Sequence, residues 1–330
     1  MFLCKIQSCR FSLKKLFRFR YIIILLIIII MVQLGINIYL FQKESLSYDS
    51  NSLINPNIAT QKSLEFKKYQ SSYLSNFNHL REDLDSYTSR VSLFGNVSVY
   101  IEDLNSGSWI GINERDRYYP GSLMKVPNAM CAMKKVETSN ISLETKQVVK
   151  EKDLNFNSGV LAYYDDILDK EFTLQQLLIF SLGDSDNTAA ALVEKFCTDK
   201  EFIDASLASG LTDSYLEGEV EGLSPRSYSN LFRTLYNSGY LKRPNSELLL
   251  SIMANSAYYE GLAFKIKDNI IISHKVGIIR NRNQYHDCGI VYEKENPYLI
   301  CVMTKGYTYE EAQDIISQIS KITYDHIKSY

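Results

Sequence analysis

The spacing of hydrophobic and polar positions changes several times along the chain. Residues 21–42 (YIIILLIIIIMVQLGINIYLFQ) contain no charged side chain, and roughly 20 apolar residues are enough for a helix to cross a bilayer. The polar segment 43–61 that follows predicts a short stalk. From residue 62 to 91 the apolar residues recur at helical spacing, which predicts an amphipathic helix.

Alternating apolar and polar residues then predict strands. The segments NVSVYIEDL and SWIGINERD, joined by a tight turn at Asn105–Gly107, predict a hairpin. Three later segments have the same character: NIIISHKVG, DCGIVYE and PYLICVMTK. Between these two groups of strands the pattern is mostly helical. The candidate helices are 122–136, 173–181, 187–197, 201–208, 226–237 and 245–253, and an amphipathic helix follows over 309–327.

This order of elements predicts an α/β protein of the α+β type. The first two strands are far in sequence from the last three, and a single five-stranded antiparallel sheet would bring them together. The N- and C-terminal helices would then cover one face of the sheet and the helical block the other. We expect a basic tail over 1–20, a transmembrane anchor over 21–42, a stalk over 43–61, and a domain over 62–330 with a helical subdomain at about 122–260.

The charges favour an uncleaved anchor. Residues 1–20 hold six basic side chains and no acidic one, and positive charge before a span keeps that end in the cytoplasm. A cleaved signal peptide is the alternative, but no small-x-small cleavage site follows the span. The whole chain has 36 Lys and Arg against 38 Asp and Glu, so the rest is acidic overall. Nothing in it indicates nucleic acid as a partner.

The cysteines and histidines match no metal or cofactor pattern. The chain has no H-E-x-x-H, paired C-x-x-C, P-loop or G-x-G-x-x-G motif, so we expect no metal and no cofactor. Cys4 and Cys9 precede the predicted span. We expect the other four cysteines to be buried free thiols, with a cross-strand bridge between Cys288 and Cys301 as the alternative. These four are Cys131, Cys197, Cys288 and Cys301.

Candidate chemistry begins at Ser122 and Lys125, in the stretch YYPGSLMKVPNAM. Residues three apart on a helix share a face, and a serine hydroxyl becomes a nucleophile when a neighbouring base takes its proton. A lysine can be that base if burial lowers its pKa. The spacing alone is weak evidence, because Ser12 and Lys15 repeat it in the basic tail. The alternative is a helix-capping serine with an exposed lysine.

Two further motifs follow in order. Ser185, Asp186 and Asn187 open a predicted helix, where capping is the alternative interpretation. Lys275 and Gly277 lie in the late strand segment NIIISHKVG, where an edge-strand charge is the alternative. S-x-x-K, S-D-N and K-x-G in this order resemble the signature of the class A β-lactamase-like serine hydrolases and penicillin-binding proteins, from about residue 95 to 330.

This resemblance implies a β-lactamase/transpeptidase-like fold and a role for each motif residue. Ser122 matches the acylated nucleophile, and Lys125 matches the lysine that takes its proton. Ser185 matches the serine that relays a proton to the leaving nitrogen, supported by Lys275. Substrate binding would fall to Asn187, Lys275, Gly277 and Ile278, the last through its backbone N–H as an oxyanion donor beside that of Ser122. Asp186 matches a structural residue that turns inward.

Two departures from the family pattern limit what the resemblance implies. Val276 replaces the hydroxyl residue of K-T-G, and Arg280 or Arg282 could supply the lost contact to a substrate carboxylate. The E-x-x-L-N motif, whose glutamate activates the deacylating water, is not found in the region after S-D-N. The acidic positions in the corresponding region, which also suit a solvated loop, are Glu217, Glu219 and Glu221.

The expected function is therefore a serine hydrolase acting through an acyl-serine on β-lactams or D-Ala-D-Ala-like peptides. Its expected partners are a small β-lactam or a peptidoglycan stem peptide. We expect a single-pass protein of a bacterial cell membrane, with a cytoplasmic N-terminus and an extracytoplasmic catalytic domain. The alternative is a slow-turnover penicillin-binding, peptidoglycan-binding or sensory module.

Overall fold

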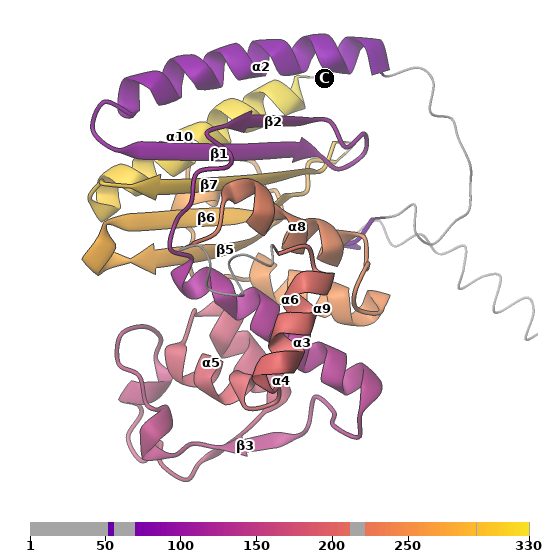
Figure 1. Ribbon diagram of the computed structural model, residues 1–330, viewed down its shortest axis with the longest axis vertical. Helices are drawn as coiled ribbons and strands as arrows, with labels where there is room; N and C mark the ends of the chain where they lie inside the picture. Colours follow the sequence, from indigo (N-terminus) through magenta and orange to yellow (C-terminus); the bar gives the residue numbers. More distant parts are fainter. Residues whose placement is uncertain (1–51, 56–69, 212–221, 295, 330) are drawn as a thin grey trace, which may run out of the picture. The chain divides into compact units, whose positions relative to one another are not determined.

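The computed structural model describes residues 52–55, 70–211, 222–294 and 296–329, all within one unit of the chain (Figure 1). The predicted tail and anchor lie outside these residues. No helix among the described residues is long and apolar enough to cross a membrane. Residues 52–55 of the predicted stalk pack on the folded domain, because the Leu53 carbonyl accepts a hydrogen bond from Tyr292 Oη at 2.8 Å.

Five strands form one sheet, as the alternation predicts. The strand order is β2-β1-β7-β6-β5 and every neighbouring pair is antiparallel. Strands far apart in sequence therefore pair in the centre, where β1 lies against β7. The bounds are β1 Asn96–Asp103, β2 Trp109–Ile112, β5 Ile272–Ile279, β6 Gln284–Val291 and β7 Tyr298–Lys305.

Helices cover both faces of the sheet, as expected. The terminal helices α2 (Gln70–Val91) and α10 (Tyr309–Lys328) lie on one face (Figure 1). On β1, Val97 and Val99 belong to the core on that side, whereas Tyr100 belongs to the core on the other, because successive strand residues point to opposite faces. The predicted α+β arrangement of five strands and terminal helices is confirmed.

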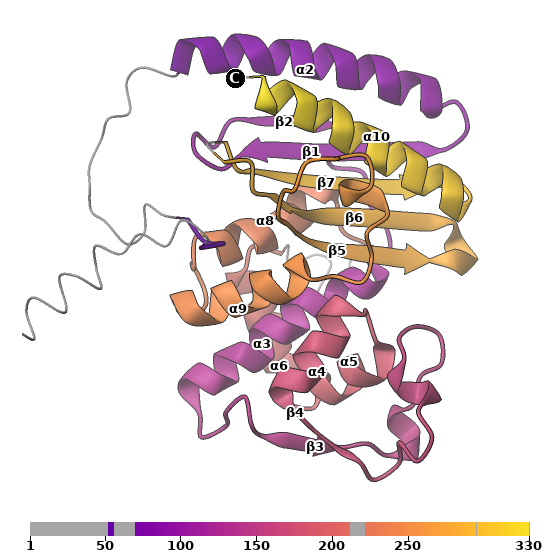
Figure 2. The ribbon, with the colours of Figure 1, turned by 180° about the vertical axis from the view of Figure 1, so that it is seen from behind.

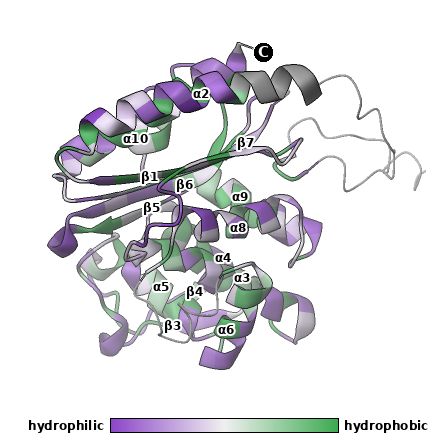
Figure 3. Ribbon diagram, turned by 45° about the horizontal axis from the view of Figure 1, so that its top comes forward, coloured by the Kyte–Doolittle hydropathy of each residue, from purple (hydrophilic) through white to green (hydrophobic). Residues whose placement is uncertain are grey.

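A helical block covers the opposite face and extends away from it (Figure 2). Figure 3 shows hydrophilic residues along the exposed side of α2 and hydrophobic residues gathered among the helices of this block. The block consists of α3 Lys125–Thr138, α4 Leu174–Leu178, α5 Asn187–Glu194, α6 Asp199–Ala208, α8 Pro225–Tyr236 and α9 Arg243–Ala254.

Three local features differ from the prediction. Residues 122–124 form a 3₁₀ turn, η2 (Gly121–Met124), ahead of α3. A small sheet of β3 (Lys146–Val148) and β4 (Glu171–Thr173) was not predicted. Helix α5 ends at Glu194 rather than at residue 197, and a capping box of Thr198 and Glu201 begins α6.

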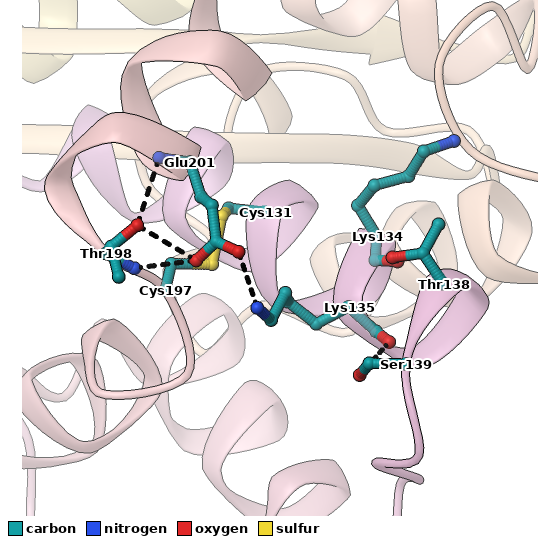
Figure 4. The surroundings of a disulfide bond; sticks show 8 residues. All are labelled: Cys131, Lys134, Lys135, Thr138, Ser139, Cys197, Thr198 and Glu201. Atoms are coloured by element: carbon teal, nitrogen blue, oxygen red, sulfur yellow. Dashed lines mark hydrogen bonds and ion pairs between the residues drawn. A yellow bond between two sulfur atoms is a disulfide. The ribbon is translucent and has the colours of Figure 1, made fainter.

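Both pairs of downstream cysteines form disulfides, so the prediction of free thiols is wrong. Cys288 and Cys301 lie directly opposite each other on β6 and β7, which is the cross-strand alternative. Cys131 on α3 pairs with Cys197, which follows α5, although 66 positions separate them. Figure 4 shows this second bridge beside the capping box of α6. Packing of the helical block creates this pair, and sequence spacing does not reveal it.

Candidate active site

Ser122 and Lys125 lie at the junction between η2 and α3. Residues three apart in a 3₁₀ turn have eclipsed side chains, so the change of helix type keeps Ser122 and Lys125 on one face of the turn. Pro120 occupies the N-cap position of η2, and only 6% of Lys125 is exposed. The alternative of a capping serine with an exposed lysine is therefore wrong.

The backbone around Ser122 is fitted closely to strand β5. Gly121 has a φ of +53°, and a Cβ there would lie 2.7 Å from Cγ1 of Ile279. A Cβ on Gly277 would lie 2.8 Å from the carbonyl oxygen of Pro120. The two glycines thus allow η2 and β5 to approach each other. Pro127 is the third residue of α3, where a backbone N–H has no partner within the helix, so its ring costs little.

Lys125 points into the loop that holds the second motif. Its Nζ donates to the carbonyl oxygen of Ser185, to Ser185 Oγ at 3.2 Å and to Asn187 Oδ1 at 2.7 Å. Burial lowers the pKa of Lys125 to about 8, while the negative charges of Asp186 and Glu194 act in the opposite direction. A lysine with this pKa can lose its proton near neutral pH.

The loop from Ser185 to Asn187 lies between the π-helical turn η5 (Ile179–Gly183) and α5. Ser185 has a φ of +54°, a conformation that a non-glycine residue keeps only where its surroundings hold it. Asp186 supplies that support. Its Oδ1 accepts from the N–H of Ala189 at 2.8 Å, and Oδ2 accepts from those of Val160 and Leu161 at 2.7 and 2.8 Å. The inward, structural position predicted for Asp186 is confirmed.

Lys275 approaches the same loop from β5. Only 1% of its surface is exposed, and its Nζ donates to Ser185 Oγ at 2.8 Å. Burial holds the pKa of Lys275 well below its ordinary value, and the positive charge of Lys125 lowers it further. Strand β5 is an edge strand, but its lysine is buried rather than solvated, so that alternative is wrong.

Five of the seven predicted site residues meet at one cleft of about 1080 Å³, whose lining does not include Lys275 or Gly277. Ser122, Lys125, Ser185, Asn187 and Ile278 all line it. Lys275 lies beneath the wall and reaches the site through Ser185. Within the described part of the chain, the Ser122 hydroxyl makes no hydrogen bond. The motifs that the sequence singled out therefore converge on one surface, with Ser122 open to an incoming molecule.

The cleft also contains residues that the motifs did not indicate. Asn155 and Ser158 come from the segment between β3 and β4, and Ser158 Oγ donates to the carbonyl oxygen of Ser185 at 3.0 Å. Asn128 and Glu194 line the cleft from α3 and α5. The spacing within each helix indicates that both residues face the cleft, because Asn128 follows Lys125 by three positions and Glu194 follows Asn187 by seven.

Two histidines near β5 serve the fold rather than the cleft. His274 is adjacent to Lys275 but faces the other way, and its Nδ1 lies 2.8 Å from Asp287 Oδ1. His286 contacts the Tyr119 carbonyl through Nε2, and burial lowers its pKa to about 4. In the described ranges, no group of three or more His, Cys, Asp or Glu residues is arranged to hold a metal ion.

Residues 80–327 match the sequence model of the Beta-lactamase enzyme family. The chain belongs to this family. β-Lactamase VEB-1 of Pseudomonas aeruginosa is 21% identical over 253 residues, covering 70% of this chain and 85% of VEB-1. The structure of a PBP-A variant in acyl-enzyme complex with penicillin G has a TM-score of 0.68 at 19% identity, covering 77% of this chain and 97% of PBP-A.

A β-lactamase from Sphaerobacter thermophilus has a TM-score of 0.70 at 18% identity, covering 76% of this chain and 97% of that protein. These likenesses confirm the fold. Together with the family match they confirm the resemblance to the class A β-lactamase-like proteins, and the chain is a serine hydrolase of the β-lactamase type.

One of the two departures from the β-lactamase pattern falls on this cleft. Val276 lines it and is 3% exposed, so an apolar side chain stands where the family signature has a hydroxyl. Arg280 lines the cleft with its guanidinium over the ring of Tyr309, whereas Arg282 lies over the ring of Tyr119. The acidic positions Glu217, Glu219 and Glu221 lie outside the described residues.

Proposed function

We propose that this protein is a membrane-anchored, extracytoplasmic acyl-hydrolase that forms an acyl-serine at Ser122. Its substrates are β-lactams or D-Ala-D-Ala-like peptides of the cell wall. The observation that carries this proposal is the shared hydrogen-bond network: Lys125 and Lys275 both donate to Ser185 Oγ beside the open Ser122 hydroxyl. Nucleophile, base and proton relay thus share one cleft.

Acylation follows from this network. Ser122 Oγ attacks the carbonyl carbon of the substrate while neutral Lys125 accepts its proton. The carbon–oxygen bond forms, the carbon–nitrogen bond breaks, and the proton passes through Ser185 Oγ to the departing nitrogen. In the free protein Lys125 Nζ donates hydrogen bonds to the Ser185–Asn187 loop. As substrate enters, Lys125 gives up one of these hydrogen bonds and interacts with the Ser122 hydroxyl instead.

Substrate binding is assigned to the walls of the cleft. The backbone N–H groups of Ser122 and Ile278, on either side of the contact between η2 and β5, receive the oxyanion. Asn187 holds the substrate amide. Because Val276 has no hydroxyl to offer a substrate carboxylate, Arg280 takes that charge at the mouth of the cleft, supported by its position over the Tyr309 ring.

Residues 21–42 are assigned as the membrane anchor, with residues 1–20 in the cytoplasm and the catalytic domain outside. The two disulfides support this location, since such bonds persist in oxidising compartments. Protease treatment of intact cells tests it. The domain is expected to be digested from outside and the cell-associated fragment to retain the basic tail. Protection of the domain in intact cells contradicts the assignment.

A fluorescent penicillin tests the catalytic proposal. The purified full chain is expected to be labelled covalently, and Ser122→Ala to lose the label. Labelling that persists in Ser122→Ala disproves the nucleophile. If penicillin is excluded by Val276, a D-Ala-D-Ala thioester is the second probe, and turnover that disappears in Lys125→Ala supports the proposal.

The second candidate is a slow-turnover penicillin-binding or wall-binding module. The absence of E-x-x-L-N from the region after S-D-N favours it, because the acyl-enzyme would then persist. Mass spectrometry after exposure to a β-lactam separates the two: an adduct that decays within minutes supports the hydrolase, and one that lasts for hours supports the slow module.

A further inference from the structure

Helix α5 presents one face to the cleft, and that face ends in a carboxylate. Asn187, Ala190, Ala191 and Glu194 all line the cleft, at spacings of three, four and seven residues that place them on one side of a helix. Asn187 and Glu194 are about 10 Å apart along the axis. The two alanines between them project only methyl groups, which leaves room for water along this wall.

Glu194 is held in place from the helix that carries the nucleophile. Asn128 Nδ2 donates to Glu194 Oε1 at 2.9 Å. Asn128 lies one helical turn beyond Lys125, and Ser122, Lys125 and Asn128 all line the cleft. Glu194 Oε1 is thereby oriented, and among the described residues Oε2 has no hydrogen-bond partner, so that oxygen is available to a water molecule.

Charge connects Glu194 to the reacting groups. The carboxylate raises the pKa of Lys125, and Lys125 in turn lowers that of Glu194, so the two groups act on each other across the cleft. Partial desolvation at the cleft wall has the larger effect on Glu194 and raises its pKa above the ordinary value, although the residue is exposed overall. A carboxylate with a raised pKa is a stronger base than a solvated one.

We propose that Glu194 activates the water that hydrolyses the acyl-Ser122 intermediate. This inference rests on the proposed function above. Glu194 Oε2 accepts a proton from water while the water oxygen attacks the acyl carbon. The new carbon–oxygen bond forms and the bond from Ser122 Oγ to that carbon breaks. The proton held by Glu194 then passes through Lys125 to Ser122 Oγ, which returns Glu194 to its carboxylate form. One water is consumed and one carboxylic acid leaves.

The test separates formation of the acyl-enzyme from its decay. Full-length protein is mixed with penicillin G, and intact-mass spectrometry follows the adduct before and after removal of free penicillin. Glu194→Gln keeps the shape of the side chain but cannot accept the proton. We expect the adduct to form at the wild-type rate or faster, because Lys125 loses the charge that raises its pKa, and to decay at least 100-fold more slowly.

Two further variants make the result specific. Asn128→Ala frees Glu194 and is expected to slow decay about tenfold with formation retained, which a general loss of folding would not produce. Glu144→Gln alters an exposed glutamate that does not line the cleft, and its adduct should form and decay as in the wild type.

The outcomes distinguish this inference from the function on which it rests. An adduct that decays in Glu194→Gln at the wild-type rate overturns the role of Glu194 and leaves the acyl-serine intact. A wild-type chain that forms no adduct with penicillin G, a cephalosporin or a D-Ala-D-Ala thioester overturns both.

Discussion

Lys275 Nζ lies 2.8 Å from Ser185 Oγ, and the whole lysine side chain is buried. The same hydroxyl accepts from Lys125 Nζ at 3.2 Å. Two ammonium groups therefore share one small acceptor in a region with little water. Burial disfavours the charged form of both lysines, and the positive charge of Lys125 further disfavours that of Lys275. This arrangement is costly for the fold and useful for moving a proton through Ser185.

Lys275→Met is expected to stabilise the protein and weaken its chemistry. Burial lowers the pKa of Lys275 in the folded state, so the unfolded chain binds more protons, and this lysine destabilises the fold until pH reaches its ordinary pKa of about 10.5. Methionine fills similar space without charge, and Ser185 keeps Lys125 as a partner. We expect about 1–3 kcal/mol of added unfolding free energy at pH 7 and acylation slowed on the order of a hundredfold. Urea unfolding and adduct formation measure the two effects, and a destabilised variant contradicts the argument.

Acylation should rise with pH because Lys125 acts as a base only when neutral. Its pKa is about 8, so the neutral fraction increases as pH rises through that value. The acylation rate should be about tenfold higher at pH 9 than at pH 7 and then level off. Lys125→Arg serves as the control, since arginine does not deprotonate. A wild-type rate that stays constant from pH 6 to 9 would exclude Lys125 as the base.

Sequence patterns predict the structural features that depend on residues close together in the chain. The sheet follows from alternation in each strand, and the pairing of Ser122 with Lys125 follows from a spacing of three. The contacts between α3 and α5 depend instead on how the helical block packs. Cys131 meets Cys197 across 66 positions, and Glu194 meets Asn128 across a similar separation. No local pattern marks these pairs, so the disulfide was missed and Glu194 resembled an ordinary helix end.

Gly159 is expected to be essential for the loop that holds Ser185. Its φ is +96°, and an added Cβ would overlap Oδ2 and Cα of Asp186. Gly159→Ala should lower the unfolding free energy by about 3 kcal/mol, from backbone strain and collision together. Gly107→Ala is the matched control, because Gly107 has a φ of +73° with no atom within 4 Å of its Cβ position. That change should cost only about 1 kcal/mol. Equal losses in urea unfolding would show that the contact with Asp186 is unimportant.

The two disulfides should differ in their contribution to stability. Cross-links that close longer loops remove more entropy from the unfolded chain. The Cys131–Cys197 bridge spans 66 positions and the Cys288–Cys301 bridge spans 13. Replacing both cysteines of a pair by alanine should cost about 4 kcal/mol for the first bridge and about 3 kcal/mol for the second. The prediction fails if urea unfolding shows that removing the Cys288–Cys301 bridge lowers the unfolding free energy more than removing the Cys131–Cys197 bridge.

Val276→Thr should restore a contact that the family signature provides. Val276 is nearly buried at the cleft wall, so threonine, which has almost the same shape, adds a hydroxyl without enlarging the side chain. A hydrogen bond from this hydroxyl to a substrate carboxylate contributes about 1.5–3 kcal/mol. Acylation by penicillin at low concentration should therefore rise about 10–100-fold, chiefly through tighter binding, with deacylation unchanged. Val276→Ala separates added polarity from added space: if alanine accelerates acylation as much as threonine does, valine acts by obstructing the cleft and the missing hydroxyl is irrelevant.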